Sequence, residues 1–437
     1  MTEGLHILRL GVSLGAIHDS SERYPAPNCH PDTRKAVRQI ILDWICNQSS
    51  AFSFFWLYGP AGAGKTAILQ AIAEFLCSPS GSGQNFGGSF FFSRGRQGRD
   101  QGHFLFSTIA YQLALKVPGL RQCVNRIMGL DPTLHTKSMV VQLQTLIVKA
   151  FKDLSPLPQR SYLVIIDGLD ECHDKAAQQL ILRLLCETIT VHKLPLRFLI
   201  GSRPESHIRA SFDQESLYTI THRVVLDETF NPGRDIQVFL RGGFAKICTE
   251  NSSIMSHVEQ PWPSEGIIDL LVQRSSGQFI YAATVLKFVG ADFCSPTKQL
   301  ALVLKPDHTA FSDLDQLYTQ ILSVYPSNVN IVQVLGIITA SHGKFAFASA
   351  RVYEDIFGLE KGQLKQVLRG LLSLMKDEND YYGLREDDIP HFAHASFSDY
   401  LFDSNRSGPF HVNQQEYENQ VTIRSFAIII QLIRSWR

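Results

Sequence analysis

The segment GPAGAGKT (59–66) constrains the fold of this chain more than any other part of the sequence. An apolar run, FSFFWLY (52–58), precedes it, and an amphipathic stretch, KTAILQAIAEFLC (65–77), follows it. A strand, a glycine-rich loop and a helix in this order are typical of a phosphate-binding loop. Its backbone N–H groups converge on phosphate oxygens, and the helix adds the positive end of its dipole. A bound nucleotide is therefore expected here.

Four residues of this loop have distinct expected roles. Gly59 and Gly64 allow the backbone to approach the phosphates closely. Lys65 supplies a positive charge near the β- and γ-phosphates, and Thr66 can bind Mg²⁺ through its hydroxyl.

A second apolar run, YLVIIDGLDE (162–171), delivers acidic residues at the end of a strand. Ligands of open α/β sheets collect at the carboxyl ends of the strands. Asp167 is expected to hold the magnesium ion through water. Either Asp170 or Glu171 can orient and deprotonate an attacking water molecule, and Glu171 is the preferred candidate.

A third strand candidate, LRFLIGSRPE (196–205), places Arg203 at the same edge. A cation at this position can sense or neutralise a γ-phosphate. The order of phosphate loop, acid and arginine on three strand ends is more specific than any one of the motifs.

Short apolar runs alternate with amphipathic stretches from 52 to about 226, which predicts an α/β fold. Apolar strands separated by helices are typical of a parallel sheet buried on both faces, and right-handed crossovers make it doubly wound. We predict a leader and linker helix over 1–50 and the nucleotide-binding domain over 51–226. A helical domain (227–326), a winged-helix-like domain (327–403) with a hairpin around the acidic stretch DENDYYGLREDD, and an irregular tail (404–437) are expected to follow.

Composition excludes several classes of protein. The 41 Lys and Arg residues balance 41 Asp and Glu residues, so no excess of cations favours a nucleic-acid partner. The longest apolar stretches fall short of the ~20 residues that a membrane-spanning helix needs. The eight cysteines lie far apart without a C-x-x-C pair and indicate buried, reduced thiols in a cytoplasmic protein.

Together with CHPDTRKAVRQIILDW, which precedes them, GPAGAGKT, IIDGLDEC and LIGSRPE resemble the NACHT-type NTPases of fungal STAND proteins, which are regulatory switches related to the NLR innate-immunity receptors. LDETFNPGRDIQVFL and FAHASFSDYLFD resemble the helical and winged-helix parts of the same families. The resemblance implies ATP and ADP with Mg²⁺ as cofactors, slow ATP hydrolysis and a signalling switch that oligomerises on ATP binding, with an unidentified effector or sensor protein as partner.

The resemblance also implies roles for individual residues. Gly62 and Ala67 join the nucleotide cradle, and Arg203 becomes the sensor. His394 matches a histidine that reaches the β-phosphate of ADP in related receptors. One departure is Gly277-Gln278-Phe279, where the family often has Gly-x-Pro near the adenine.

Two alternatives to the switch remain open from the sequence. One is a P-loop kinase-like metabolic phosphotransferase, although no arginine-rich lid or acceptor pocket is recognisable. The other is a degenerate adaptor that binds nucleotide only for stability. The loop that carries Arg94, Arg96 and Arg99 is expected to be a solvated basic loop.

Overall fold

The computed structural model describes residues 3–81, 85–291, 295–305, 312–323, 331–341, 350–375, 392 and 394–435. The chain divides into two compact units, residues 1–230 and residues 231–437.

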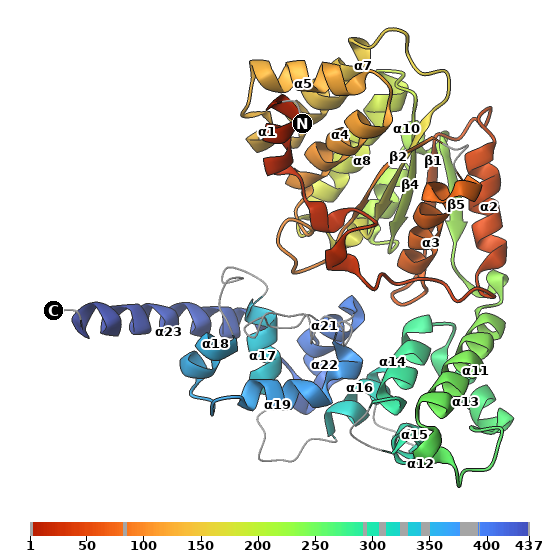
Figure 1. Cartoon of the computed structure of the whole chain (residues 1–437), viewed down its shortest axis with the longest axis vertical. Coiled ribbons are helices and arrows are strands. Elements are labelled where there is room, and N and C mark those ends of the chain that lie inside the picture. The colour runs from red at the N-terminus through yellow and green to blue at the C-terminus, as the bar shows by residue number, and fades with distance from the viewer. Residues whose placement is uncertain are drawn as a thin grey trace. The chain divides into compact units, whose positions relative to one another are not determined.

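The first unit is built on a five-stranded sheet in the order β2-β3-β4-β1-β5, and every strand pair is parallel (Figure 1). The predicted doubly wound parallel sheet is thus confirmed. The strands are β1 (Phe54–Tyr58), β2 (Phe86–Phe91), β3 (Tyr162–Asp167), β4 (Leu196–Ser202) and β5 (Thr221–Val225). The helices of this unit are α1 (Glu3–Leu8), α2 (Lys35–Cys46), α3 (Lys65–Cys77), α4 (Leu105–Lys116), α5 (Leu120–Leu130), α6 (Met139–Gln142), a π-helix (Leu143–Lys149), α7 (Ala150–Lys152), α8 (Lys175–Thr190), α9 (Ser206–Phe212) and α10 (Glu215–Tyr218).

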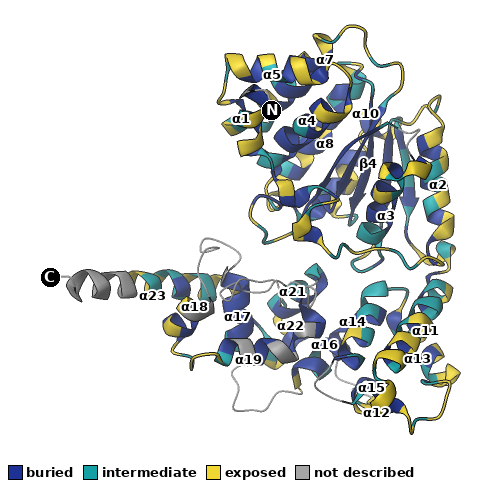
Figure 2. Ribbon diagram, viewed as in Figure 1, coloured by how far each residue is buried: buried dark blue, intermediate teal, exposed yellow. Residues whose placement is uncertain are grey.

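Both faces of the sheet are covered because side chains alternate between two apolar cores. Phe55 and Ile165 belong to the core that includes side chains of α2 and α3, whereas Trp56 and Ile166 belong to the core shared with α4, α5 and α8. β3 and β4 are accordingly buried along their whole length (Figure 2), and β1 is buried except at Tyr58. This arrangement matches the expectation for apolar strands in a parallel sheet.

The register of the strands brings the carboxyl ends of β1, β3 and β4 to one edge of the sheet. Tyr58 of β1 pairs with Ser202 of β4, and Ile166 of β3 pairs with Ile200 of β4. The chain therefore leaves β1, β3 and β4 at nearly the same level.

The N-terminal leader is part of the first unit's core, although the sequence indicated only a linker before its helix. Leu5 and Leu8 of α1 are fully buried, and α1 packs on α5. Farther along, the Gln70 amide of α3 donates to the His18 carbonyl (3.0 Å). Burial of the leader depends on these long-range contacts, which local periodicity does not reveal.

The second unit is helical throughout its described regular elements. One apolar core runs through it from Ile236 to Val421. Its helices are α11 (Pro232–Glu250), α12 (Ser252–Met255), α13 (Glu265–Ser275), α14 (Phe279–Val289), α15 (Pro296–Leu304), α16 (Asp313–Ser323), α17 (Ile331–Ser341), α18 (Ala350–Phe357), α19 (Gln363–Gly370), α21 (Ala395–Phe402), α22 (Ser404–Ser407) and α23 (Gln414–Ser435).

Two expectations for this unit have different outcomes. The acidic stretch of the expected hairpin lies outside the described residues, but Met375 and Phe392 on either side of it form an antiparallel bridge. The expectation of an irregular tail over 404–437 is wrong, because Gln414–Ser435 forms α23. This helix packs against α17, where a Cβ added at Gly336 would lie 2.4 Å from the Tyr417 ring.

The structure also bears on two expectations drawn from composition, one about membrane-spanning helices and one about the cysteines. Within the described ranges, none of the helices combines the length and the apolar character that crossing a bilayer requires. The cysteines are not uniformly buried, since Cys46 and Cys77 are exposed at or near the ends of α2 and α3.

We expect Leu8→Ala to lower the free energy of unfolding of the first unit by about 2–4 kcal/mol, because it opens a cavity in a packed core. Leu10→Ala is the matched control, since Leu10 is 73% exposed, and it should change this free energy by less than about 0.5 kcal/mol. Urea unfolding followed by tryptophan fluorescence, to which Trp44 and Trp56 of the first unit contribute, measures both values. Equal effects would show that the leader is not part of the core.

Candidate functional site

The loop between β1 and α3 has the backbone of a phosphate cradle. Gly62 (φ 73°) and Gly64 (φ 91°) both adopt left-handed conformations, which side chains other than hydrogen disfavour. Lys65 Nζ donates to the carbonyls of Gly59 and Pro60, at 2.8 Å each. These bonds use two of the three N–H groups of the ammonium. Ala67 lies in the first turn of α3, directly after the loop.

Arg34 supports this loop from outside and was not singled out from the sequence. Its side chain is almost fully buried, and Nη2 donates to the Ala63 carbonyl at 2.8 Å. Arg34 itself has a left-handed backbone (φ 56°) immediately before α2. The start of α2 is thereby connected to the phosphate loop.

Asp167 is the buried acid of the site. It is 2% exposed at the end of β3, and its Oδ1 has no hydrogen-bond partner among the described residues. Burial raises the pKa of the Asp167 carboxyl, whereas a hydrogen bond with Thr66 and the charges of Arg23 and Lys65 act in the opposite direction. Burial likewise lowers the pKa of Lys65, and the carboxylates of Asp170 and Asp167 oppose this shift.

These two residues fit a magnesium ion. Mg²⁺ is usually held by one or two protein oxygens together with phosphates and water. No group in the described part of the chain is a hydrogen-bond partner of the buried Asp167 Oδ1, and the Thr66 hydroxyl hydrogen-bonds to the same carboxylate. Among the described residues, no cluster of three or more His, Cys, Asp or Glu side chains could hold a metal by itself.

Asp170 and Arg203 form a close ion pair. Asp170 Oδ1 accepts the backbone N–H of Arg203 at 2.9 Å, and Arg203 Nε lies 3.2 Å from Oδ2. Both side chains are largely buried. Both oxygens of Asp170 are therefore engaged by the residue that follows β4.

Glu171 differs from Asp170 in its contacts. Its Oε2 accepts the backbone N–H of Arg94 at 3.1 Å. Burial, together with the charges of Asp170 and Asp167, raises the pKa of Glu171 to about 7. A carboxylate with this pKa is suited to accept a proton near neutral pH.

The expectation of a solvated basic loop holds for only part of the arginine cluster. Arg94 is exposed, but Arg99 is 5% exposed, and its Nε donates to the Phe91 carbonyl at 3.2 Å. Burial and the neighbouring charges of Arg96 and Arg23 lower the pKa of Arg99 to about 9. Arg99 is thus a buried cation beside the end of β2.

His394 belongs to the second unit and has a local structural role. It precedes α21, and its Nδ1 accepts the backbone N–H of Ser396 at 3.1 Å. This contact caps the first turn of the helix. A role at the nucleotide stays a prediction.

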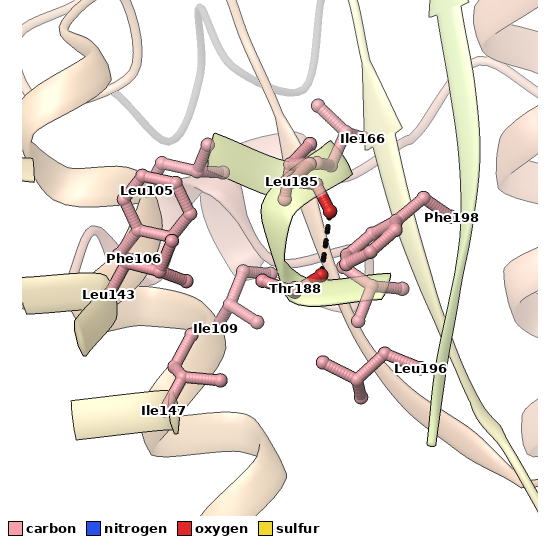
Figure 3. A pocket seen from close by; sticks show the side chains of 11 residues that line it. Leu105, Phe106, Ile109, Leu143, Ile147, Ile166, Leu185, Thr188, Leu196 and Phe198 are labelled. Carbon is pink, nitrogen blue, oxygen red and sulfur yellow. Dashed lines mark hydrogen bonds between the residues drawn. The ribbon is translucent and has the colours of Figure 1, made fainter. Parts of the chain in front are cut away.

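An apolar cavity lies elsewhere in the first unit (Figure 3). Side chains of α4, the π-helix and α8 line it beneath β3 and β4, as Ile109, Ile147 and Phe198 show. The Thr188 hydroxyl in its wall donates to the Leu185 carbonyl at 2.6 Å, so this polar group is already paired. The cavity is a gap in the core on the face opposite α3.

A comparison with protein families supports the P-loop assignment. Residues 37–203 match the sequence model of the N-terminal region of nephrocystin 3. The match covers less than half of the chain but includes the phosphate loop, Asp167 and Arg203. Among curated proteins, no significant match to the sequence was found. The fold, the loop and this match identify a P-loop NTPase domain.

Several solved structures have a weak overall likeness to the chain. They include the Walker-type ATPase PABY2304 of Pyrococcus abyssi (13% identity, 81% of this chain and 94% of that chain, TM-score 0.37). Cdc6p from Pyrobaculum aerophilum (12%, 83% and 92%, 0.38) and the RuvB Holliday junction branch migration motor of Thermotoga maritima (13%, 83% and 96%, 0.30) are similar to the same degree. At these TM-scores the likeness says nothing further about this chain.

Gly201 of β4 provides a test of the proposed magnesium position. A Cβ at this residue would lie 2.6 Å from Asp167 Oδ1 and 2.5 Å from Leu69 Cδ1. Gly201→Ala should turn the carboxylate away and weaken ADP binding in Mg²⁺ by about 10-fold or more, the value of one charged contact. Binding in EDTA should change by less than about threefold.

Gly129→Ala is the matched control, because nothing lies within 4 Å of a Cβ added there. Calorimetric titration with ADP measures both variants with and without Mg²⁺. An equal loss in EDTA and in Mg²⁺ would contradict the role of Asp167.

Proposed function

We propose that this protein is a nucleotide-operated signalling switch that binds ATP or ADP with Mg²⁺, hydrolyses ATP slowly and changes conformation or oligomeric state between the two nucleotides. The observation that carries the proposal is the meeting of three strand ends at one sheet edge. The phosphate loop follows β1, Asp167 ends β3, and Arg203 follows β4. This is the edge at which parallel α/β sheets bind ligands.

Each group at this edge has a role in the proposal. Lys65 and the loop N–H groups bind the phosphates. When bound, Mg²⁺ is held by Thr66 and Asp167 and neutralises charge on the β- and γ-phosphates. Glu171 orients a water molecule and accepts its proton. Asp170 is the weaker candidate for the base, because Arg203 engages both of its oxygens.

The Arg203–Asp170 pair is the proposed switching contact. A γ-phosphate competes with Asp170 for the guanidinium of Arg203, whereas ADP leaves the pair intact. A ligand shifts an equilibrium only by its different affinity for the two states, and this exchange of partners supplies such a difference. The Arg203 contact thus favours a nucleotide sensor over a phosphotransferase.

The resemblance to NACHT-type NTPases of STAND proteins supports the signalling role, oligomerisation on ATP binding and a cytoplasmic location. These three statements belong to the proposal. The match to the N-terminal region of nephrocystin 3 supports its nucleotide-binding part.

The switch predicts different solution behaviour with the two nucleotides. With a non-hydrolysable ATP analogue the protein should elute from a sizing column as a larger or more open species than with ADP. Lys65→Ala is the control. It removes a charged contact worth ~1.5–3 kcal/mol, so both affinities should fall by about 10- to 100-fold and the difference should vanish. Identical elution of the wild type with both nucleotides would contradict the switch.

The raised pKa of Glu171 predicts the pH dependence of hydrolysis. A general base works only when ionised, so kcat/KM for ATP should rise with pH and reach half its maximum near pH 7. Glu171→Gln should lower the rate by about 10²- to 10⁴-fold and remove this dependence, while nucleotide binding persists. Asp170→Asn should have the smaller effect on the pH profile. If Asp170→Asn alone removes the profile, Asp170 is the base.

A further inference from the structure

Arg23 of the leader lies against the end of β2, next to the acid of the site. It ends a short 3₁₀ turn, Ser21–Arg23, and is 4% exposed. Its guanidinium carbon lies 3.7 Å from the centroid of the Phe91 ring. Phe91 is the residue of β2 that pairs with Asp167 of β3. The leader therefore carries a buried cation to the carboxyl edge of the sheet.

A second contact fixes Arg23 to the helix that follows the phosphate loop. Its Nη2 donates to Gln70 Oε1 at 2.7 Å. Gln70 stands one turn after Thr66 on α3, and its amide also donates to the His18 carbonyl of the leader. Arg23 is thus held between α3 and β2, on the face of the sheet to which Asp167 points.

The carboxylates near Arg23 act on it from a distance rather than in a close ion pair among the described residues. Among the described residues it forms no ion pair within 4 Å, and its Nε has no hydrogen-bond partner. Burial lowers the pKa of Arg23 to about 10, while the charges of Asp167, Glu74 and Glu171 oppose this shift and that of Arg96 adds to it. A buried cation without a close counter-ion is costly unless an anion compensates it.

Neighbouring cations increase this local excess of positive charge. Arg99, also buried, lies close enough to Arg23 and Arg96 for their charges to lower its pKa. Two of the carboxylates at this edge already have partners, since Asp170 pairs with Arg203 and Glu171 accepts the N–H of Arg94. An incoming polyanion would relieve the repulsion among the arginines.

We propose that Arg23 is a phosphate-binding residue of this site, supplied by the leader, which contacts the γ-phosphate and gives the site preference for ATP over ADP. The inference rests on the proposed nucleotide-binding function. The phosphate loop cradles the phosphates beside β1 and α3, whereas Arg23 stands beyond Asp167, on the side of β2. In a phosphate-binding loop of this kind, the γ-phosphate and the metal lie on the side of the acidic residue that ends the neighbouring strand, which is Asp167 here. Planar guanidinium groups bind phosphate oxygens in pairs.

The alternative is that Arg23 only fastens the leader to the domain. Arg23→Met retains an apolar stem over Phe91 but removes the charge, and Arg23→Lys keeps the charge without the planar fork. Ser89→Ala is the matched control for docking. The buried Ser89 hydroxyl accepts the backbone N–H of His18 at 3.0 Å, so its loss loosens the leader and leaves Arg23 unchanged.

The experiment measures the affinities of a non-hydrolysable ATP analogue and of ADP, both in Mg²⁺, by calorimetry for the wild type and the three variants. Arg23→Met should weaken the ATP analogue by about 10- to 100-fold and ADP by less than about threefold. Arg23→Lys should show a smaller loss in the same direction. Ser89→Ala should leave the ratio of the two affinities unchanged. In the wild type, the ATP analogue should slow hydrogen exchange in the leader segment 12–24 more than ADP does.

Equal weakening of both nucleotides by Arg23→Met, or no change, would overturn the inference and leave Arg23 as a fastening residue. If Arg23→Met does not fold, an unchanged affinity ratio in Arg23→Lys together with equal exchange in segment 12–24 would overturn it as well. Failure of the wild type to bind either nucleotide would instead contradict the proposed function. The two failures are therefore distinguishable. If only the role of Arg23 is wrong, the wild type still binds both nucleotides.

Discussion

The structure of the candidate site depends on one buried carboxylate. Asp167 is almost completely shielded from water, yet its Oδ1 has no hydrogen-bond partner among the described residues. Burial of a carboxylate is unfavourable unless cations or hydrogen bonds compensate it. Thr66, Lys65 and Arg23 supply part of that compensation from α3 and from the leader. A Cβ added at Gly201 would lie 2.6 Å from Asp167 Oδ1, so the glycine at this position leaves room for the carboxylate.

The leader packs closely against the elements that carry this site. Leu5 and Leu8 bury its first turn, and Arg23 reaches the end of β2. Farther along the chain, Arg34 connects the start of α2 to the phosphate loop through the Ala63 carbonyl. Two buried arginines from the segment before β1 thus contact the elements of the site, Arg34 at the phosphate loop and Arg23 at α3 and β2.

The sequence predicted the parts of the fold that local patterns determine. The bounds of α3 agree with the expected run 65–77, and β4 begins at the expected Leu196, since each has a continuous apolar or amphipathic signal. β5 was not singled out, because Thr221–Val225 is a short edge strand with polar side chains. Arg99 was expected in solvent, and only the packing of its loop against β2 buries it. The structural reason to prefer Glu171 over Asp170 as the base was likewise not visible in the sequence. It is the contact of Asp170 with Arg203, which joins two loops that are distant in the sequence.

The central claim is that the carboxyl edge of this sheet holds a nucleotide together with magnesium. The most direct measurement is to denature freshly purified wild-type protein and to identify and quantify the nucleotide that it releases, with equilibrium binding of ADP in Mg²⁺ and in EDTA measured on the stripped protein. The account predicts ADP or ATP in a ratio approaching one per chain, and rebinding that Mg²⁺ strengthens. Absence of released nucleotide combined with no binding of ADP or ATP to the stripped, folded protein would contradict it.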